Sequence, residues 1–316
     1  MAQYRSALPQ LGGGLFLTDG GIETTLIFHD GLELPDFAAY QLLGRPEGEA
    51  ALQKYFRAYA EIAKRFGVGL ILESATWRAS RDWAERLGHT PRELADLNRA
   101  AVHQLDGIRR EFQTGKTPIV ISGCLGPRGD GYNPASLMSV EQAEAYHGEQ
   151  ARVFADSAAD LLTAITMNYV EEAIGITRAA RSVTMPVVIS FTVETDGRLP
   201  TGDTLQAGIE RVDAATAAYP AYYMINCAHP THFERVLDGK KPWAQRLRGL
   251  RANASRQSHA ELNESPTLDT GDPAELGREY AALKRRLPRL CVMGGCCGTD
   301  HRHVEQIAAA CAPLFP

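Results

Sequence analysis

The sequence has no long apolar run and few cysteines, and each of these absences excludes a class of protein. No stretch reaches the roughly 18 apolar residues that a membrane-spanning helix needs. The first residues, 1–9, contain no apolar core of a secretory signal peptide. Six cysteines among 316 residues, with no Cys-x-x-Cys motif, do not make a disulfide scaffold. We therefore expect a cytoplasmic protein that does not enter a membrane.

An excess of basic residues is absent as well. Lys and Arg number 33 against 38 Asp and Glu, a formal net charge of −5, which argues against a nucleic acid or an anionic membrane surface as a partner. The glycine run at residues 12–14 precedes a predicted strand instead of following one, so it is not a phosphate-binding loop. With 44% hydrophobic residues, the chain has the composition of an ordinary globular protein with an ample core.

Short apolar runs alternate with longer segments of helical periodicity along the whole chain. The predicted strands are residues 14–19, 69–73, 118–122, 160–165, 186–191, 222–226, 247–252 and 290–293. The predicted helices are residues 52–66, 91–112, 139–158, 170–180, 205–218, 232–237, 273–287 and 300–311. A long polar loop is expected at residues 253–272, above the active face.

This alternation predicts the fold class. Near-continuous apolar strands separated by helices are typical of a parallel sheet covered on both faces. Eight strand–helix units are the number in an α/β protein of the (β/α)₈, or TIM barrel, type. A doubly wound open sheet is the alternative. We predict one barrel domain over residues 1–316 and leave the oligomeric state open.

Three cysteines stand at the ends of predicted strands. Cys227 follows the strand at residues 222–226, and Cys296 and Cys297 follow the strand at residues 290–293. In a barrel, the carboxyl ends of the strands form the active face, so both segments deliver sulfur to one rim. The glycines around the adjacent pair permit a sharp turn by which both thiols bind one soft metal ion. Three thiolates around zinc leave a fourth position open, as in catalytic sites.

Two other interpretations of these cysteines remain. In a redox protein, Cys296 and Cys297 would cycle between dithiol and disulfide, but neighbouring cysteines are poorly placed to bond each other. In a non-catalytic zinc barrel, a protein group would fill the fourth position. Cys124, just after the strand at residues 118–122, is a further possible metal ligand.

The strand ends resemble those of the homocysteine S-methyltransferase family, the zinc-dependent thiol-methylating barrels. The resemblance extends over nearly the whole chain and implies zinc ligation by Cys227, Cys296 and Cys297, with no catalytic side chain beyond these ligands. It also implies that the loop from Asp19 to Gly21 holds the amino-acid end of the thiol substrate. The matching segments are Thr18-Asp19-Gly20-Gly21, Ala75-Thr76-Trp77-Arg78-Ala79-Ser80, Asn226-Cys227 and Gly294-Gly295-Cys296-Cys297-Gly298-Thr299.

One position departs from the family pattern. Family members commonly have a glutamate before a threonine at the end of the fourth strand, where it binds the ammonium of homocysteine. This sequence has Ile165 before Thr166. Either another carboxylate compensates, with Glu23, Glu73 and Glu194 as candidates near strand ends, or the acceptor is not an α-amino thiol of the usual kind.

The resemblance implies methyl transfer from a cationic donor to a small thiol such as homocysteine, giving methionine, a step of methionine biosynthesis. The donor would be a sulfonium, such as S-methylmethionine or S-adenosylmethionine, or a betaine, because a single domain of this length has no room for folate or cobalamin modules, unless separate proteins supply a methylcobalamin. Cationic centres bind aromatic faces or carboxylates, and Trp77, Phe191 and Glu194 stand at strand ends for this role. A thiol or selenol other than homocysteine is the alternative acceptor. The predicted substrate-binding residues are Asp19, Gly20, Gly21, Glu23, Trp77, Glu194 and Asn226.

Overall fold

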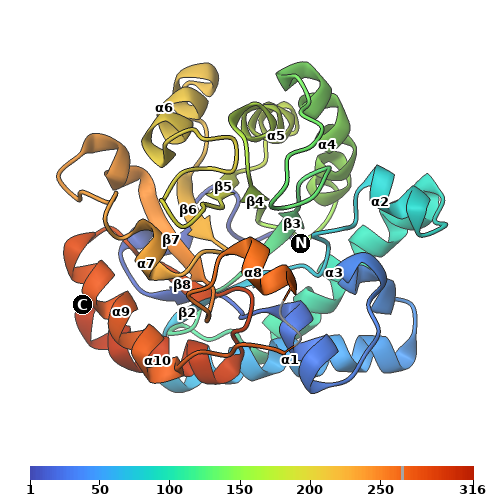
Figure 1. Ribbon diagram of the computed structural model, residues 1–316. Helices are drawn as coiled ribbons and strands as arrows, with labels where there is room; N and C mark the ends of the chain where they lie inside the picture. Colours follow the sequence, from blue (N-terminus) through green and yellow to red (C-terminus); the bar gives the residue numbers. More distant parts are fainter. Residues whose placement is uncertain (265–266) are drawn as a thin grey trace.

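The computed structural model describes residues 1–264 and 267–316 of the chain. Within them, eight parallel strands follow one another around a closed barrel (Figure 1), which closes because β1 pairs with both β2 and β8. The predicted (β/α)₈ barrel is therefore confirmed, and the open sheet is excluded. The strands are β1 (Phe16–Leu17), β2 (Gly69–Glu73), β3 (Ile119–Leu125), β4 (Leu161–Met167), β5 (Val187–Phe191), β6 (Tyr222–Asn226), β7 (Leu247–Ala252) and β8 (Val292–Gly295).

Helices form the layer around the barrel (Figure 1). The longer helices are α1 (Pro46–Phe66), α3 (Pro91–Phe112), α4 (Val140–Ala155), α5 (Val170–Ser182), α6 (Leu205–Thr216), α9 (Pro273–Arg286) and α10 (His301–Cys311). The shorter segments are α2 (Arg81–Arg86), α7 (Pro230–Phe233), α8 (His259–Glu264), η1 (Pro9–Gly12), η2 (Thr24–His29), η3 (Pro35–Phe37), η4 (Ala39–Leu42), η5 (Pro242–Arg246) and η6 (Ala312–Leu314).

Capping residues explain where two of the predicted helices, α3 and α1, begin or end. Thr90 caps α3, with its hydroxyl accepting from the Glu93 amide while the Glu93 carboxylate accepts from the Thr90 amide. Pro91 occupies the first turn, where its missing amide hydrogen costs nothing. At the other end of such helices glycine is favoured: α1 stops at Gly67, which has a φ of +64°.

The barrel interior is apolar at one end and polar at the other. Because residues two apart on a strand face the same side, the apolar layer and the polar layer above it come from the same strands. The apolar layer contains Phe16, Ile71, Val120, Leu161, Val188, Met224 and Val292. Two residues further along their strands lie the buried polar side chains of Glu73, Ser122, Thr163, Ser190 and, on β7, Arg251. The polar layer lies toward the carboxyl ends of the strands, where barrel enzymes carry their sites.

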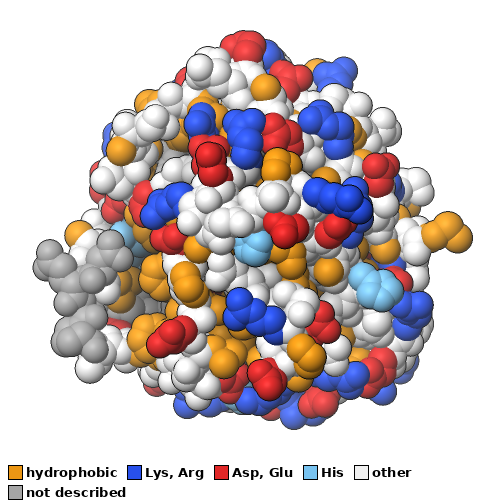
Figure 2. Space-filling model, turned by 90° about the vertical axis from the view of Figure 1, so that its right-hand side faces the viewer, with side chains coloured by type: hydrophobic (Ala, Val, Ile, Leu, Met, Phe, Trp, Pro, Cys, Tyr) orange, Lys and Arg blue, Asp and Glu red, His pale blue; other side chains and the backbone are white. Residues whose placement is uncertain are grey.

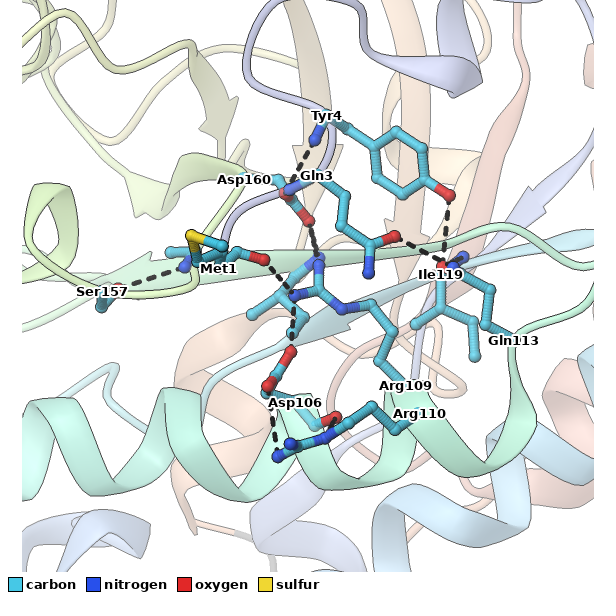
Figure 3. A network of polar contacts seen from close by, with 12 residues as sticks. Met1, Gln3, Tyr4, Asp106, Arg109, Arg110, Gln113, Ile119, Ser157 and Asp160 are labelled. Carbon is cyan, nitrogen blue, oxygen red and sulfur yellow. Dashed lines mark hydrogen bonds and ion pairs between the residues drawn. The ribbon is translucent and has the colours of Figure 1, made fainter.

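A buried ion pair anchors the N-terminal segment across the opposite end of the barrel (Figure 3). Asp160, just before β4, accepts from Arg109 of α3 at 2.8 Å, and neither side chain is exposed. The same carboxylate accepts from the backbone amides of Gln3, Tyr4 and Ile121. The first residues of the chain are thereby bound to the middle of the sequence.

The outer surface carries charges of both signs. On the face that α2 covers, acidic and basic side chains are interspersed (Figure 2), and ion pairs such as Arg81–Glu149 at 2.7 Å and Arg128–Asp82 at 2.6 Å link its elements. Within the described residues, no helix has both the length and the apolarity needed to cross a bilayer.

The differences from the predicted elements lie mainly in loops. Strand β8 begins two residues later than predicted, and α7 ends before the predicted helix at residues 232–237 does. The loop predicted at residues 253–272 contains the short helix α8, and its residues 265–266 lie outside the described part. The segment after β1 folds into the π-helical turn η2, which apolar periodicity does not predict because its period is neither that of a strand nor that of an α-helix.

Replacing Asp160 by alanine should lower the free energy of unfolding by about 3–5 kcal/mol, because the buried Arg109 would keep only Asp106 as a partner and the amides of Gln3, Tyr4 and Ile121 would lose their common acceptor. Urea denaturation followed by circular dichroism measures this change. The matched control is Glu111→Ala, which breaks the exposed Arg57–Glu111 pair and should cost less than about 1 kcal/mol. Equal costs for the two variants would contradict the assigned role of Asp160.

Candidate metal centre and substrate cavity

The three predicted cysteine ligands converge at the carboxyl end of the barrel. The sulfur atoms of Cys227, Cys296 and Cys297 all lie within 4.8 Å of one another. Cys227 and Cys296 are joined as a disulfide, and the Cys297 sulfur lies 4.0 Å from that of Cys227. Thiolates bound to one tetrahedral zinc ion lie about 3.8 Å apart. After reduction of the disulfide, the cluster therefore fits a tetrahedral metal ion.

Two consecutive backbone carbonyls of β7 accept hydrogen bonds from the two cysteine loops. The Cys227 amide donates to the Arg251 carbonyl at 3.1 Å, and the Cys296 amide donates to the Ala252 carbonyl at 2.8 Å. The Ala254 amide donates to the Cys297 carbonyl at 3.0 Å. The separation of the two loops is thus set by one strand between them.

A buried amide holds the backbone at Cys227. Cys227 and Thr166 both have positive φ values, 53° and 66°, which are uncommon for residues with a side chain. Asn226 accepts from the Thr166 amide at 2.9 Å and from the Ser190 hydroxyl at 2.6 Å, and it donates to the Thr166 hydroxyl at 2.8 Å. These bonds tie the ends of β4, β5 and β6 together beneath the sulfur cluster. Strain of this kind persists at functional sites where the surroundings impose it.

Glycines bring the first and last strand ends close together. A Cβ atom on Gly21 would lie 2.6 Å from the Cys296 carbonyl oxygen, and Gly298 has a φ of +78°. A side chain at Gly21 would push the loop after β1 away from the cysteine pair, and one at Gly298 would collide with the Asp269 carbonyl oxygen, 2.6 Å from its Cβ, in the loop after β7. Within the Gly-Gly-Cys-Cys-Gly segment, Gly298 is thus constrained by packing as well as by its backbone conformation.

A cavity of about 320 Å³ opens beside the sulfur cluster. Cys297 is exposed toward it, whereas Cys227 is buried. The inner end is lined by buried polar side chains, and Phe28 and Phe37, both more than half exposed, line its mouth. The inner residues are Asp19, Glu73, Cys124 and Arg251.

An ion pair occupies the inner end of the cavity. Arg251 lies 2.8 Å from Asp19, which also accepts from the Tyr55 hydroxyl at 2.8 Å. Burial raises the pKa of Asp19, although Arg251 and Tyr55 act in the opposite direction. Arg251 also donates to the carbonyls of Gly20 and Gly295, so it links the loops after β1 and β8.

Besides Asp19, four carboxylates line the cavity, those of Glu23, Glu73, Asp130 and Asp269, and none has an ion-pair partner among the described residues. Burial raises the pKa of Glu73 to about 7, and one oxygen of its carboxylate is buried without a hydrogen bond. Burial likewise raises the pKa of Glu23 to about 7. With Arg251 paired to Asp19, the inner end of the cavity holds more carboxyl groups than cations, and a cationic ligand would favour their ionised forms.

The opposite wall is aromatic. The Trp77 indole donates to the Ile165 carbonyl at 3.2 Å, and the Tyr132 hydroxyl lies 3.7 Å from the Cys297 sulfur. The Tyr132 ring packs against the ring of His259 at a centroid distance of 4.1 Å. His259, from α8, also hydrogen-bonds to the Cys227 carbonyl, so this short helix contacts the cysteine loop.

The predicted substrate-binding residues divide into two groups. Asn226 and Glu194 do not line the cavity. The Asn226 side chain forms its hydrogen bonds with Thr166 and Ser190. The Glu194 carboxylate pairs with His259 at 3.4 Å. The residues that do line the cavity are Asp19, Gly20, Gly21, Glu23 and Trp77.

The positions of Phe191 and Cys124 decide two further predictions, that of a donor-site wall and that of an additional metal ligand. The prediction that Phe191 forms a wall of the donor site is wrong, because its ring is fully buried and stacks on Tyr223 in the layer between barrel and helices. Cys124 lines the cavity but lies outside the sulfur cluster.

The sequence analysis missed Arg251, Tyr132, His259 and Arg78, all of which line the cavity. An arginine inside the predicted strand at residues 247–252 was a signal, since a charged side chain in a buried strand needs a partner. Tyr132 and His259 stand in loops whose course the sequence does not reveal.

Among solved structures, the homocysteine methyltransferase MmuM from Escherichia coli is similar in three forms. The oxidized form has a TM-score of 0.71 at 20% sequence identity, with 94% of this chain and 95% of that chain covered. The metallated form has a TM-score of 0.69 at 18% identity and the apo form 0.64 at 19%, each with 94% of this chain and 96% of that chain covered. At these identities the likeness establishes the fold.

The family comparison covers most of the chain. No curated protein sequence matches it significantly. A family model described as homocysteine S-methyltransferase matches residues 16–311, which include the sulfur cluster and the cavity. The chain therefore belongs to the homocysteine S-methyltransferase family and is a methyltransferase.

Proposed function

We propose that this protein, as one barrel domain over residues 1–316, transfers a methyl group from a cationic donor to the thiol of homocysteine, giving methionine. Zinc would be held by Cys227, Cys296 and Cys297. The observation that carries the proposal is the convergence of three sulfur atoms within 4.8 Å beside a cavity lined by carboxyl groups. Membership of the family supports a thiol as the acceptor.

Zinc bound by three thiolates lowers the pKa of an incoming thiol and keeps its sulfur nucleophilic. The protein supplies the geometry for this chemistry. Asn226 and the backbone of β7 fix the positions of the cysteine loops, and Cys297 faces the cavity. The metal centre requires reduced cysteines, so the Cys227–Cys296 disulfide must open before metal binds.

A cationic donor follows from the charge balance of the reaction. The acceptor sulfur forms a bond to the methyl carbon, the bond from that carbon to the donor's S⁺ or N⁺ breaks, and its electron pair leaves the donor atom neutral. A negative sulfur and a positive donor thus neutralise each other in the transition state, which a water-poor cavity favours. Sulfonium compounds and betaines meet this requirement, and Trp77 offers an aromatic wall for the donor.

Homocysteine also brings an ammonium group, and Ile165 occupies the position where the family commonly has a glutamate. Glu73 and Glu23 are cavity carboxylates without an ion-pair partner among the described residues, although the charge of Arg251 acts on both. We assign the ammonium to this pair. A bound cation would favour their ionised forms and give the free oxygen of Glu73 a partner.

Reduced protein should bind about one zinc ion per chain and lose methyl transfer on chelation. Metal analysis, thiol counting and mass spectrometry of the methylated product with donor and acceptor panels measure these properties. Cys297→Ser should lose the zinc, whereas Cys124→Ser, which changes a cavity cysteine outside the cluster, should retain it. Reversible dithiol–disulfide cycling without bound metal would support a redox protein instead.

Glu73→Gln should raise the KM for homocysteine roughly 10- to 100-fold, because a charge-assisted hydrogen bond to the ammonium is lost. The KM for 4-mercaptobutanoate, the same thiol without an amino group, should change less than about twofold. Glu23→Gln tests the second carboxylate in the same assay. If both thiols respond equally to both substitutions, the ammonium binds elsewhere or is absent from the true acceptor.

The same substitution should stabilise the unliganded protein at alkaline pH. The folded-state pKa of Glu73 is about 7, above its ordinary value of 4.5, so folding favours the protonated form and the contribution of Glu73 to stability falls as pH rises from 4.5 through 7. Glu73→Gln should therefore gain about 3 kcal/mol of unfolding free energy between pH 4 and pH 8, relative to the unaltered protein. Urea titrations at both pH values measure this, and the exposed Glu111→Gln should show no such trend.

A further inference from the structure

Two side-chain hydroxyl groups lie beside the sulfur atoms of the cluster. The Thr166 hydroxyl lies 3.9 Å from the Cys227 sulfur, and it also accepts from the Asn226 amide at 2.8 Å. The Tyr132 hydroxyl lies 3.7 Å from the Cys297 sulfur, within reach of a hydrogen bond to sulfur. Cys297 is not part of the disulfide, so this second contact does not depend on the opening of that bond.

The backbone at Tyr132 is held from two sides. The Asp130 carboxylate accepts from the Tyr132 amide at 2.8 Å, which closes an Asx turn. The buried Asn168 side chain, just after β4, donates to the carbonyls of Asp130 and Gly131 at 2.9 and 3.0 Å. A Cβ atom on Gly131 would lie only 3.1 Å from the Thr166 side chain, so this turn packs directly on the end of β4.

The ring of Tyr132 is held as well. It packs against the ring of His259 at a centroid distance of 4.1 Å, and His259 hydrogen-bonds to the Cys227 carbonyl. The tyrosine therefore meets one cysteine loop through its hydroxyl and the other through His259. Because both its backbone and its ring are already fixed, a hydrogen bond from the hydroxyl to sulfur costs little further conformational entropy.

The charge of the cluster gives this hydroxyl a role. Three thiolates around a divalent zinc ion carry a net charge of −1, and a bound acceptor thiolate makes it −2. Such charge is costly in a cavity from which water is excluded, unless polar groups of the protein replace the lost hydration. Among the three cysteines, Cys297 is the most exposed, and it lines the cavity. Its sulfur therefore loses the most hydration when substrates fill the cavity.

We propose that the Tyr132 hydroxyl donates a hydrogen bond to the Cys297 thiolate of the metal-loaded protein and thereby stabilises the anionic cluster in a water-poor cavity. This inference rests on the metal centre of the proposed function and adds a residue outside the ligand set. Groups that hydrogen-bond to metal ligands orient them and change their electron density. The loop after β3 thus contributes to the metal centre without supplying a ligand.

Cobalt(II) in place of zinc reports on this hydrogen bond. Its thiolate complexes have charge-transfer bands in the near ultraviolet, and their energy falls as the sulfur becomes richer in electrons. In reduced, cobalt-loaded protein, Tyr132→Phe should shift these bands to longer wavelength, because it removes the hydroxyl and keeps the ring against His259. Competition with a chelator should show that the variant binds zinc roughly 10- to 100-fold more weakly.

The matched control is Tyr219→Phe. It also removes one tyrosine hydroxyl, which donates to the Met185 carbonyl at 3.1 Å, and neither of these residues lines the cavity. This variant should keep the cobalt bands and the zinc affinity of the unaltered protein. The midpoint of thermal unfolding confirms that both variants are folded.

The outcomes separate this inference from the proposed function. If the reduced, unaltered protein binds neither zinc nor cobalt, the proposed metal centre is wrong and this inference is wrong with it. If metal binds and the cobalt bands of Tyr132→Phe equal those of the unaltered protein, only the hydrogen bond is overturned, whatever the effect of the substitution on methyl transfer. Loss of a phenolate-to-cobalt band in Tyr132→Phe would also overturn it, because Tyr132 would then be a metal ligand.

Discussion

The site depends on one strand, β7, whose backbone lies between two loops that are far apart in the sequence. Its consecutive carbonyls at Arg251 and Ala252 accept from Cys227 and Cys296, and the Arg251 side chain reaches Asp19 across the barrel. Since hydrogen bonds between parallel strands fix their relative register, the distance between the cysteine loops is a property of the closed barrel. The barrel therefore holds the two loops at this distance, and their separation does not depend on the flexibility of either loop.

Charged groups buried in the upper half of the barrel cost the fold stability. Glu73 and Arg78 are both almost completely buried, and neither has an ion-pair partner among the described residues. Groups of opposite sign thus remain unpaired on different walls of one cavity. A protein selected for stability alone would pair them or replace them with apolar residues.

Strand positions were predictable from the sequence because a buried parallel strand is a short apolar run between turns. The predicted strands at residues 69–73, 222–226 and 247–252 coincide with β2, β6 and β7, and the strand ends correctly placed the three cysteines on one rim. The direction of individual side chains was not predictable. In a strand buried on both faces, the apolar pattern does not distinguish inside from outside, which is why Phe191 was misplaced. Loop residues such as Tyr132 and His259 reach the cavity through contacts with residues distant in sequence.

The anchoring of the first residues on Asp160 has a consequence for how the molecule assembles. Gln3 and Tyr4 are separated from their acceptor by more than 150 residues, so during synthesis they emerge long before Asp160 exists. Contacts between such remote segments form late, because the intervening chain must first be ordered. The amino-terminal residues therefore cannot bind to this end of the barrel before Asp160 and β4 have been synthesised. Until then, Gln3 and Tyr4 lack their hydrogen-bond acceptor.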